Sequence, residues 1–414
     1  MIGHFLIHEF TPLWLNIDRI GPFQSRLESI DFTDANDESC NLYLFLSKNG
    51  HGKTTALELM AALMGMLSHD DAKAMAQANG YGSRTPFGYE ALDRGPGRAQ
   101  WDIRVRYSLD GDERVAVLSL IAGQIGTEVS LRFWDDGTLL TVGACEWHRF
   151  GFCRNEANSW AIIGRQDEWV EGLNDRLADA FNESVGGFED STLVWPTVIY
   201  FSAYRNVVPI QSSEERAVVA PRDWNYRPVH AFRTEGGHWR DSLDNLLVWL
   251  KWLDDGRYER ALELVNKRVF DDPAKFVKGV RKEPPEAIVV NSDNLHRFDA
   301  LSSGEKSLVQ LFLRLGAHMT RNTILLIDEP EAHLHENWKY RLLYQFKKFA
   351  QDHFPGQTII VATHSQEMMT ALALELQEEN LRKGGHLFET EEEEAKVFQI
   401  QEDAKKHYVK SEEE

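Results

Sequence analysis

The segment Leu46–Thr55 has the residue types and spacing of a phosphate-binding loop. It reads Leu-Ser-Lys-Asn-Gly-His-Gly-Lys-Thr-Thr and follows an apolar run. Gly50 and Gly52 let the backbone turn its N–H groups inward, and Lys53 can reach the β and γ phosphates of a nucleotide. Thr54 offers a hydroxyl ligand for Mg²⁺, and the helix that follows points its positive end at the same anion. The segment therefore predicts a site for a magnesium-bound nucleoside triphosphate.

One position departs from the usual pattern of such a loop. Ser47 stands where a first glycine is common, which restricts the backbone at the loop entrance but removes no hydrogen-bond donor. Asn49 and Thr55 complete the residues that we expect to contact phosphate. Taken alone, the segment could also be an ordinary helix-capping loop.

Two adjacent carboxylates follow an apolar run at residues 323–327. At the end of a strand, Asp328 can hold the hydration shell of Mg²⁺, and Glu329 can polarise an attacking water. Read alone, the pair could be a salt-bridged turn. The apolar run 357–363 delivers His364 in the same way to the carboxyl edge of a sheet, where open α/β folds bind ligands.

A second helix start with anion-binding chemistry is expected near residue 302. The segment 301–307 reads Leu-Ser-Ser-Gly-Glu-Lys-Ser and precedes an apolar helix. The hydroxyl of Ser302 and the amide of Gly304 would lie at the positive end of that helix.

Hydrophobic periodicity predicts the elements that must position these groups. The run 41–46 predicts a buried strand before the loop, and residues 54–67 predict a helix after it. Alternation over 100–140 predicts an antiparallel meander with a third strand at 129–133. Further along we expect a helix near 168–181, a strand at 192–203, a surface loop at 206–237 and a helix or helix pair at 238–270.

Composition limits the partners and the cellular compartment that we expect for the chain. The 414 residues carry 45 basic and 65 acidic side chains, a formal charge of −20, and only 3 cysteines. The average field repels phosphate polymers and anionic lipid, so any nucleic-acid contact must be local. So few cysteines build no disulfide framework and fit a reducing compartment, and no apolar stretch has the length of a membrane span. We expect a cytoplasmic protein without membrane contact.

Taken in order, these segments resemble the ABC-type ATPases, which include transporter motor domains and the SMC- and RecF-type proteins. In the terms of that family, Ser47–Thr54 matches Walker A, Leu301–Glu305 the signature loop, Ile324–Glu329 Walker B with its catalytic glutamate, and His364 the switch histidine. The continuation Glu331-Ala-His-Leu-His335 resembles the AAA15/AAA21 branch shared with OLD-family ATPases. The resemblance implies an α/β fold: an ABC-type P-loop ATPase head with a mixed or parallel core sheet, an antiparallel β subdomain and a large helical insertion.

The resemblance also implies how ATP and Mg²⁺ would be held. Two heads would sandwich ATP, so that Lys53, Thr54, Asp328, Glu329 and His364 act in cis. Ser302 and Gly304 would reach the γ-phosphate of the other copy. The chain would then work as a homodimer or higher oligomer and hydrolyse ATP poorly as a monomer.

Other parts of the family's site are harder to place in this sequence. Gln77 and Gln100 are the candidates for the Q-loop glutamine, and the adenine-stacking group stays unassigned. Arg205, at a predicted strand end, is a candidate to enter the nucleotide site.

We divide the chain into four segments on these grounds. Residues 1–67 form an N-terminal ATPase lobe with Walker A, and 68–290 hold the antiparallel β subdomain and helical insertion. Residues 291–375 form a C-terminal ATPase lobe with signature, Walker B and switch histidine, and 376–414 an acidic tail.

Two local features bear on nucleic acid. Arg257–Lys282 contains eight basic and four acidic residues, which could contact a phosphate backbone or could be a solvated helix face. Trp249 and Trp252 lie on one helix face, where core packing is a better explanation than a base-stacking platform.

The family resemblance favours an ATPase of bacterial anti-phage defence, of the PARIS or Septu kind. Such a protein senses a trigger and controls a separate effector, often a nuclease. Two alternatives stay open: a RecF-like DNA repair ATPase, and a scaffold that holds ATP with slow turnover.

Overall fold

The computed structural model of the chain describes residues 5–24, 27–34, 36–47, 50–67, 90–124, 128–155, 160–164, 166–211, 214–270, 272–332, 334–353, 355–365, 368 and 380–388. Three features of the sequence lie outside these residues: Asn49 in the predicted phosphate loop, the Q-loop candidate Gln77, and residues 376–379 and 389–414 of the predicted tail 376–414.

The core of the protein is a six-stranded sheet in the order β10-β8-β15-β16-β3-β17, in which all neighbours are parallel. Its strands are β3 (Leu42–Leu46), β8 (Pro196–Phe201), β10 (Val229–Phe232), β15 (Asn322–Asp328), β16 (Thr358–Thr363) and β17 (Lys383–Leu387). β8, β15 and β16 are buried along their whole length, as expected for a parallel sheet covered on both faces.

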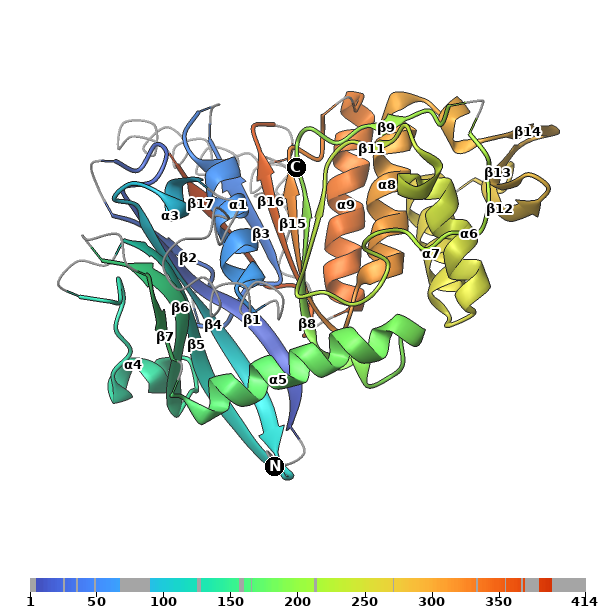
Figure 1. Cartoon of the computed structure of the whole chain (residues 1–414). Helices are drawn as coiled ribbons and strands as arrows, with labels where there is room; N and C mark the ends of the chain where they lie inside the picture. Colours follow the sequence, from blue (N-terminus) through green and yellow to red (C-terminus); the bar gives the residue numbers. More distant parts are fainter. Residues whose placement is uncertain are drawn as a thin grey trace, which may run out of the picture.

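A second six-stranded sheet has the order β2-β1-β4-β5-β6-β7. It consists of β1 (Phe5–Asp18), β2 (Glu28–Asp31), β4 (Arg98–Leu109), β5 (Asp112–Gln124), β6 (Glu146–Arg154) and β7 (Trp160–Ile163). Its pairs are antiparallel except β5 and β6, which run parallel. Helix α1 (Lys53–Gly65) lies between the two sheets, where it contacts β8, β15 and β16 of one and β4 and β5 of the other (Figure 1).

Four helices lie on the opposite side of the core sheet, two of them against its strands and two further out (Figure 1). They are α6 (Leu243–Leu253), α7 (Arg257–Val265), α8 (Ser303–His318) and α9 (Glu336–Asp352), and a short π-helical turn at Asn266–Phe270 continues α7. The three-stranded sheet of β12 (Lys275–Lys282), β13 (Pro285–Asn291) and β14 (Asn294–His296) lies beyond them. The remaining elements are α3 (Glu90–Asp93), α4 (Asp136–Thr141), α5 (Glu168–Glu183), β9 (Val207–Val208) and β11 (Glu235–Gly236).

The predicted fold class is confirmed. The chain is an α/β protein with a parallel core sheet, a mainly antiparallel second sheet and a helical part inserted before α8. The strand expected at 41–46, the helix at 54–67 and the helix pair at 238–270 are all present. The division into four segments stays a prediction.

The prediction of a third strand in the meander is wrong. Residues 129–133 do not form a strand, because their backbone is held by a side chain rather than by a neighbouring strand. Oε1 of Gln100 accepts from the N–H groups of Leu131 at 2.7 Å and Arg132 at 3.2 Å. The place of the third strand is taken by β6, which pairs parallel with β5.

Two further expectations are corrected. The predicted loop at 206–237 contains β10, whose Phe232 is buried at the edge of the core sheet. This four-residue strand is too short to show a period in the sequence. Trp252 does not pack in the core, since 63% of it is exposed, and its ring stacks on Trp249 with centroids 4.7 Å apart.

Candidate functional site

The carboxyl ends of β3, β15 and β16 meet at one edge of the core sheet, because the three strands are parallel and adjacent. The chain leaves β3 into the predicted phosphate loop, β15 into the carboxylate pair and β16 into His364. The fold therefore brings together the three segments that the sequence marked separately.

The loop after β3 has the backbone conformation that its glycines suggest. Gly50 and Gly52 have φ angles of 88° and 108°, a region that side chains disfavour. Gly52 is the N-cap of α1 and has no side chain to accept from the first N–H groups of that helix. These groups point out of the helix end, which suits an anion.

Lys53 is buried and directed back into the loop. Its ammonium donates to the carbonyl oxygen of Ser47 at 2.8 Å and to the hydroxyl of Ser47 at 2.9 Å. The residue that departs from the usual pattern thus supplies an acceptor that glycine would lack. The side chain of Lys53 is held inside the loop, where a phosphate would meet it.

Thr54 and Asp328 are in direct contact. The hydroxyl of Thr54 donates to Oδ2 of Asp328 at 2.8 Å, although the two residues are 274 positions apart. Asp328 is 1% exposed, and its Oδ1 has no hydrogen-bond partner among the described residues. Burial raises the pKa of Asp328 to about 6, with a further rise from Glu329 and an opposing effect of Thr54. A hydroxyl and an unsatisfied carboxylate are oxygen ligands that fit Mg²⁺.

Glu329 and His364 face each other beside this pair. Nδ1 of His364 lies 3.5 Å from Oε1 of Glu329 and 3.6 Å from Oε1 of Glu331. Glu331 is buried and also accepts from the hydroxyl of Thr363, so it fixes the end of β16. Glu329 and His364 are partly exposed and can meet a ligand or a water.

The backbone at Glu329 is unusual. Its φ angle is 43°, in the left-handed region that costs a residue with a side chain free energy. Its N–H donates to the carbonyl oxygen of Ala362 at 2.9 Å, which keeps β15 and β16 paired one residue beyond Asp328. Strained backbone of this kind is frequent at functional sites.

Arg205 lies beneath the carboxylates and binds the backbone of the segment that carries them. It is 5% exposed, and its guanidinium donates to the carbonyl oxygens of Asp328 at 2.7 Å and Glu329 at 2.9 Å. Burial lowers the pKa of Arg205 to about 10, and the charges of Glu331, Asp328 and Glu329 oppose that shift. The sequence placed Arg205 near the site but gave no sign that it binds backbone.

Ser302 and Gly304 lie at the N terminus of α8. Ser302 forms a capping box with Glu305: its hydroxyl accepts from the N–H of Glu305 at 3.3 Å, and its own N–H donates to the Glu305 carboxylate at 3.1 Å. Within the described part of the chain, Ser302 makes no hydrogen bond to Lys53, Thr54 or Asp328. One copy therefore does not join the signature segment to the other predicted site residues.

Gln100 is not in this site. It is buried in β4, where its amide donates to Asp102 at 2.7 Å and its carbonyl holds residues 131 and 132. Because its amide oxygen and nitrogen are bonded to Asp102 and to residues 131 and 132, away from the carboxyl edge of the core sheet, Gln100 does not fit the role of Q-loop glutamine.

The basic stretch Arg257–Lys282 is partly internal. Arg257 donates to the carbonyl oxygens of Trp224 and Ala317, Arg260 to that of Gly316, and Arg268 to Gln345 and Asp352. These arginines hold α7 and the following turn against α8 and α9. The remaining exposed cations are Lys267, Lys278, Arg281 and Lys282.

One group of described side chains has the composition of a metal site. Asp223, His230 and His318 offer ligand atoms within 4.8 Å of one another. The guanidinium of Arg314 already lies among them, 3.4 Å from Asp223 and 3.3 Å from His318, and it pairs with Glu235 at 3.0 Å. Because the Arg314 cation contacts two of the three residues and pairs with Glu235, we interpret the group as an internal ion-pair cluster.

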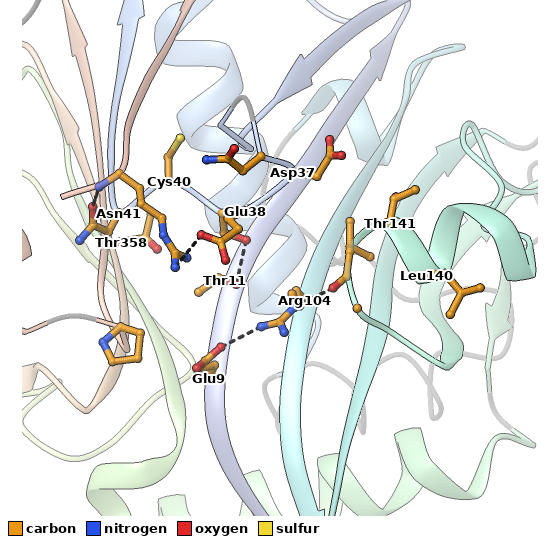
Figure 2. Close-up of a pocket in the computed structure, with 16 residues that line it drawn as sticks. Glu9, Thr11, Asp37, Glu38, Cys40, Asn41, Arg104, Leu140, Thr141 and Thr358 are labelled. Carbon is orange, nitrogen blue, oxygen red and sulfur yellow. Dashed lines mark hydrogen bonds and ion pairs between the residues drawn. The ribbon is translucent and has the colours of Figure 1, made fainter. Parts of the chain in front are cut away.

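Figure 2 shows a cavity of about 480 Å³ at the other edge of the core sheet. Asn41 and Arg382 precede β3 and β17, and Thr358 is the first residue of β16. Two ion pairs lie in its lining, Arg104 with Glu9 at 2.8 Å and Arg382 with Glu38 at 2.7 Å. The cavity lies at the amino ends of the strands and is separate from the predicted site.

Residues 221–370 match the model of the family described as AAA domain, putative AbiEii toxin, Type IV TA system. The predicted resemblance to the AAA21 branch is thereby confirmed for this part of the chain. A curated relative, the Septu protein PtuA of Bacillus thuringiensis, is 28% identical over 119 residues, which cover 26% of this chain and 29% of the relative. The match thus spans less than a third of the length of that protein.

Two solved structures are similar at a distance. An SMC head bound to the C-winged helix domain of ScpA has a TM-score of 0.39 and 12% identity, covering 87% of this chain and 91% of that chain. The SMC head domain from Thermotoga maritima has a TM-score of 0.34 and 12% identity, covering 87% of this chain and 92% of that chain.

Among the helices described here, none has the length and apolar character needed to span a bilayer.

Proposed function

We propose that the chain is a magnesium-dependent ATPase of the cytoplasm whose site is formed at the carboxyl edge of the core sheet. Lys53 and the N–H groups of the loop, with Asn49, Gly50, Gly52 and Thr55, would bind the phosphates. Thr54 and Asp328 would hold Mg²⁺. The observation that carries this proposal is the 2.8 Å contact between Thr54 and Asp328, which joins the loop to the carboxylates and leaves a buried carboxylate oxygen unsatisfied.

Glu329 and His364 would carry the chemistry. The carboxylate of Glu329 would accept a proton from a water that attacks the γ-phosphate. His364, whose Nδ1 lies 3.5 Å from that carboxylate, would orient it and contact the phosphate. Bound Mg²⁺ would supply charge stabilisation to the leaving phosphates.

In one copy the described residues show no hydrogen bond from Ser302 or Gly304 to these groups, which supports a site completed by a second copy. We propose that a second copy brings its α8 N terminus to the γ-phosphate, so that ATP lies between two protomers. Turnover would then be slow and dependent on assembly. The similarity of 119 residues to a Septu protein supports a role in anti-phage defence, in which the ATPase controls a separate effector such as a nuclease.

Steady-state ATP hydrolysis by the purified protein tests this proposal, with Glu329→Gln as the diagnostic variant. We expect the variant to bind ATP and its turnover number to fall about 10²–10³-fold, the usual effect of removing a catalytic group. It should also accumulate as an ATP-dependent dimer in sedimentation, since the nucleotide that bridges the copies is not consumed. Glu263→Gln, an exposed substitution on α7, is the control. Equal turnover in both variants would contradict the assignment.

A DNA-binding ATPase is the second candidate, because Lys267, Lys278, Arg281 and Lys282 remain exposed on an acidic chain. Duplex binding measured at two salt concentrations separates the candidates, since phosphate contacts weaken steeply with salt. Binding that is strong at low salt and lost in the Lys278→Glu variant would favour this function.

A further inference from the structure

We propose that Arg205 is a positioning residue that transmits the state of the α8 N terminus to Glu329. The inference rests on the proposed ATPase function for its consequence, while the contacts that carry it are independent of any bound nucleotide. Arg205 itself would touch neither ATP nor water.

The guanidinium of Arg205 makes contacts with three separate segments. Nη1 donates to the carbonyl oxygens of Ser202 at 3.0 Å and Asp328 at 2.7 Å, and Nη2 donates to that of Glu329 at 2.9 Å. Nε donates to the hydroxyl of Ser307 at 3.1 Å. One rigid, planar group thus joins the end of β8, the end of β15 and helix α8.

The contacts with β15 bear on the conformation of Glu329. The carbonyl oxygens of Asp328 and Glu329 converge on one cation although the chain turns left-handed between them, with φ of 43° at Glu329. A left-handed residue with a side chain persists only where its surroundings hold it. The carbonyl oxygen of Glu329 also accepts from the N–H of Ala332 at 3.0 Å, but Arg205 joins both flanking carbonyls and so helps to fix the direction in which the Glu329 side chain leaves the backbone.

The contact with α8 links this backbone to the helix start. Ser307 lies in the second turn of α8, and Ser302 is the N-cap of the same helix. When Ser302 and Gly304 of this helix reach the phosphate held by a second copy, that contact would move or fix the helix end. Because Ser307 bonds directly to Arg205, a shift of α8 would reach the carbonyl groups of Asp328 and Glu329 through one side chain.

A purely structural arginine would behave differently. Arg268 is buried to a similar degree, at 6% exposure, and bonds to Gln345 and Asp352 of α9. It has no contact with the carboxylate segment among the described residues. Arg268→Lys therefore controls for the general effect of changing a buried guanidinium.

The experiment compares Arg205→Lys, Ser307→Ala, the double variant and Arg268→Lys in ATP turnover and in affinity for a fluorescent ATP analogue. We expect Arg205→Lys to lower kcat by about 10–100-fold with unchanged nucleotide affinity, as for misplacement of a catalytic group. Ser307→Ala should lower kcat in the same sense, and the double variant should be no worse than Arg205→Lys, because both act through one contact. Arg268→Lys should keep the wild-type kcat. Additive losses in the double variant, or an equal loss in Arg268→Lys, would overturn the inference.

A crystal structure of the Arg205→Lys protein decides the point without turnover. We expect Glu329 to leave the left-handed region and the carbonyl groups of Asp328 and Glu329 to separate. If Glu329 keeps its conformation, Arg205 does not position it and the inference fails. If the wild-type protein hydrolyses no ATP, the proposed function fails instead, and the same crystal structure still tests the role of Arg205.

Discussion

Gly52→Ala should damage the phosphate loop for two separable reasons. The first is backbone conformation, since φ of 108° is unfavourable for alanine, at a cost of about 1–2 kcal/mol. The second is space, because a Cβ atom at Gly52 would lie 2.2 Å from Cζ and 2.7 Å from Cε2 of Phe23. Overpacking of this kind costs about 1–3 kcal/mol. Together they predict a loss of about 2–5 kcal/mol in the free energy of unfolding.

Gly50→Ala is the matched control for this prediction. Gly50 also has a left-handed φ, of 88°, but a Cβ atom there would meet no other atom within 4 Å. We expect Gly50→Ala to lose only the conformational part, about 1–2 kcal/mol. The difference between the two variants then measures the contact with Phe23.

Urea unfolding, followed by tryptophan fluorescence, gives the free energies. Phe23→Leu combined with Gly52→Ala should recover most of the spatial part, and the same substitution combined with Gly50→Ala should recover nothing. Affinity for ATP should fall in Gly52→Ala, because Gly52 directs the first N–H groups of α1. If the two alanine variants are equally destabilised, or if Phe23→Leu gives no recovery, the ring does not limit the loop and the reasoning is refuted.

The remaining predictions concern stability and binding. Burial raises the pKa of Asp102 to about 6, so the folded protein binds this proton more tightly than the unfolded chain and loses stability as the pH rises from about 4 to 6. Asp102→Asn should remove this pH dependence. In urea titrations, the difference in free energy of unfolding between the variant and wild type should shift by roughly 3 kcal/mol in favour of the variant between pH 4 and pH 6. If stability depends on pH equally in both proteins, the prediction is contradicted. Arg257→Met should destabilise by about 3–5 kcal/mol in the same assay, because it leaves Asp255 and two carbonyl groups without their buried cation. Lys53→Ala should abolish ATP binding in equilibrium dialysis while the protein stays folded, and retained binding would argue against the site.

The central part of the site was predictable because it depends on local patterns and on one rule of topology. An apolar run followed by Asp328 or His364 predicts a strand end, and parallel strands place such ends at one edge. The contact of Thr54 with Asp328 follows from that arrangement even though the chain separates the two residues widely.

The supporting contacts were not predictable for an equally physical reason. Arg205 binds carbonyl groups, and every residue has one, so no residue type in the sequence marks its partners. The sequence placed Arg257 in a basic stretch that could face solvent, but its guanidinium donates to the carbonyl oxygen of Ala317 inside the helical layer. The side chain of Gln100 accepts the backbone hydrogen bond that a neighbouring strand would accept, and residues 129–133 form no strand.

The position of β3 has a consequence for biosynthesis. The strand that leads into the phosphate loop lies between β16 and β17, so both of its neighbours come from residues 358–387. By contrast, β1, β2, β4 and β5 pair with one another within the first 124 residues. As the ribosome releases the chain, the second sheet can form early. The strand before the loop gains its partners only after residues 358–387 have been made, so a nascent chain would stay unable to engage nucleotide until then.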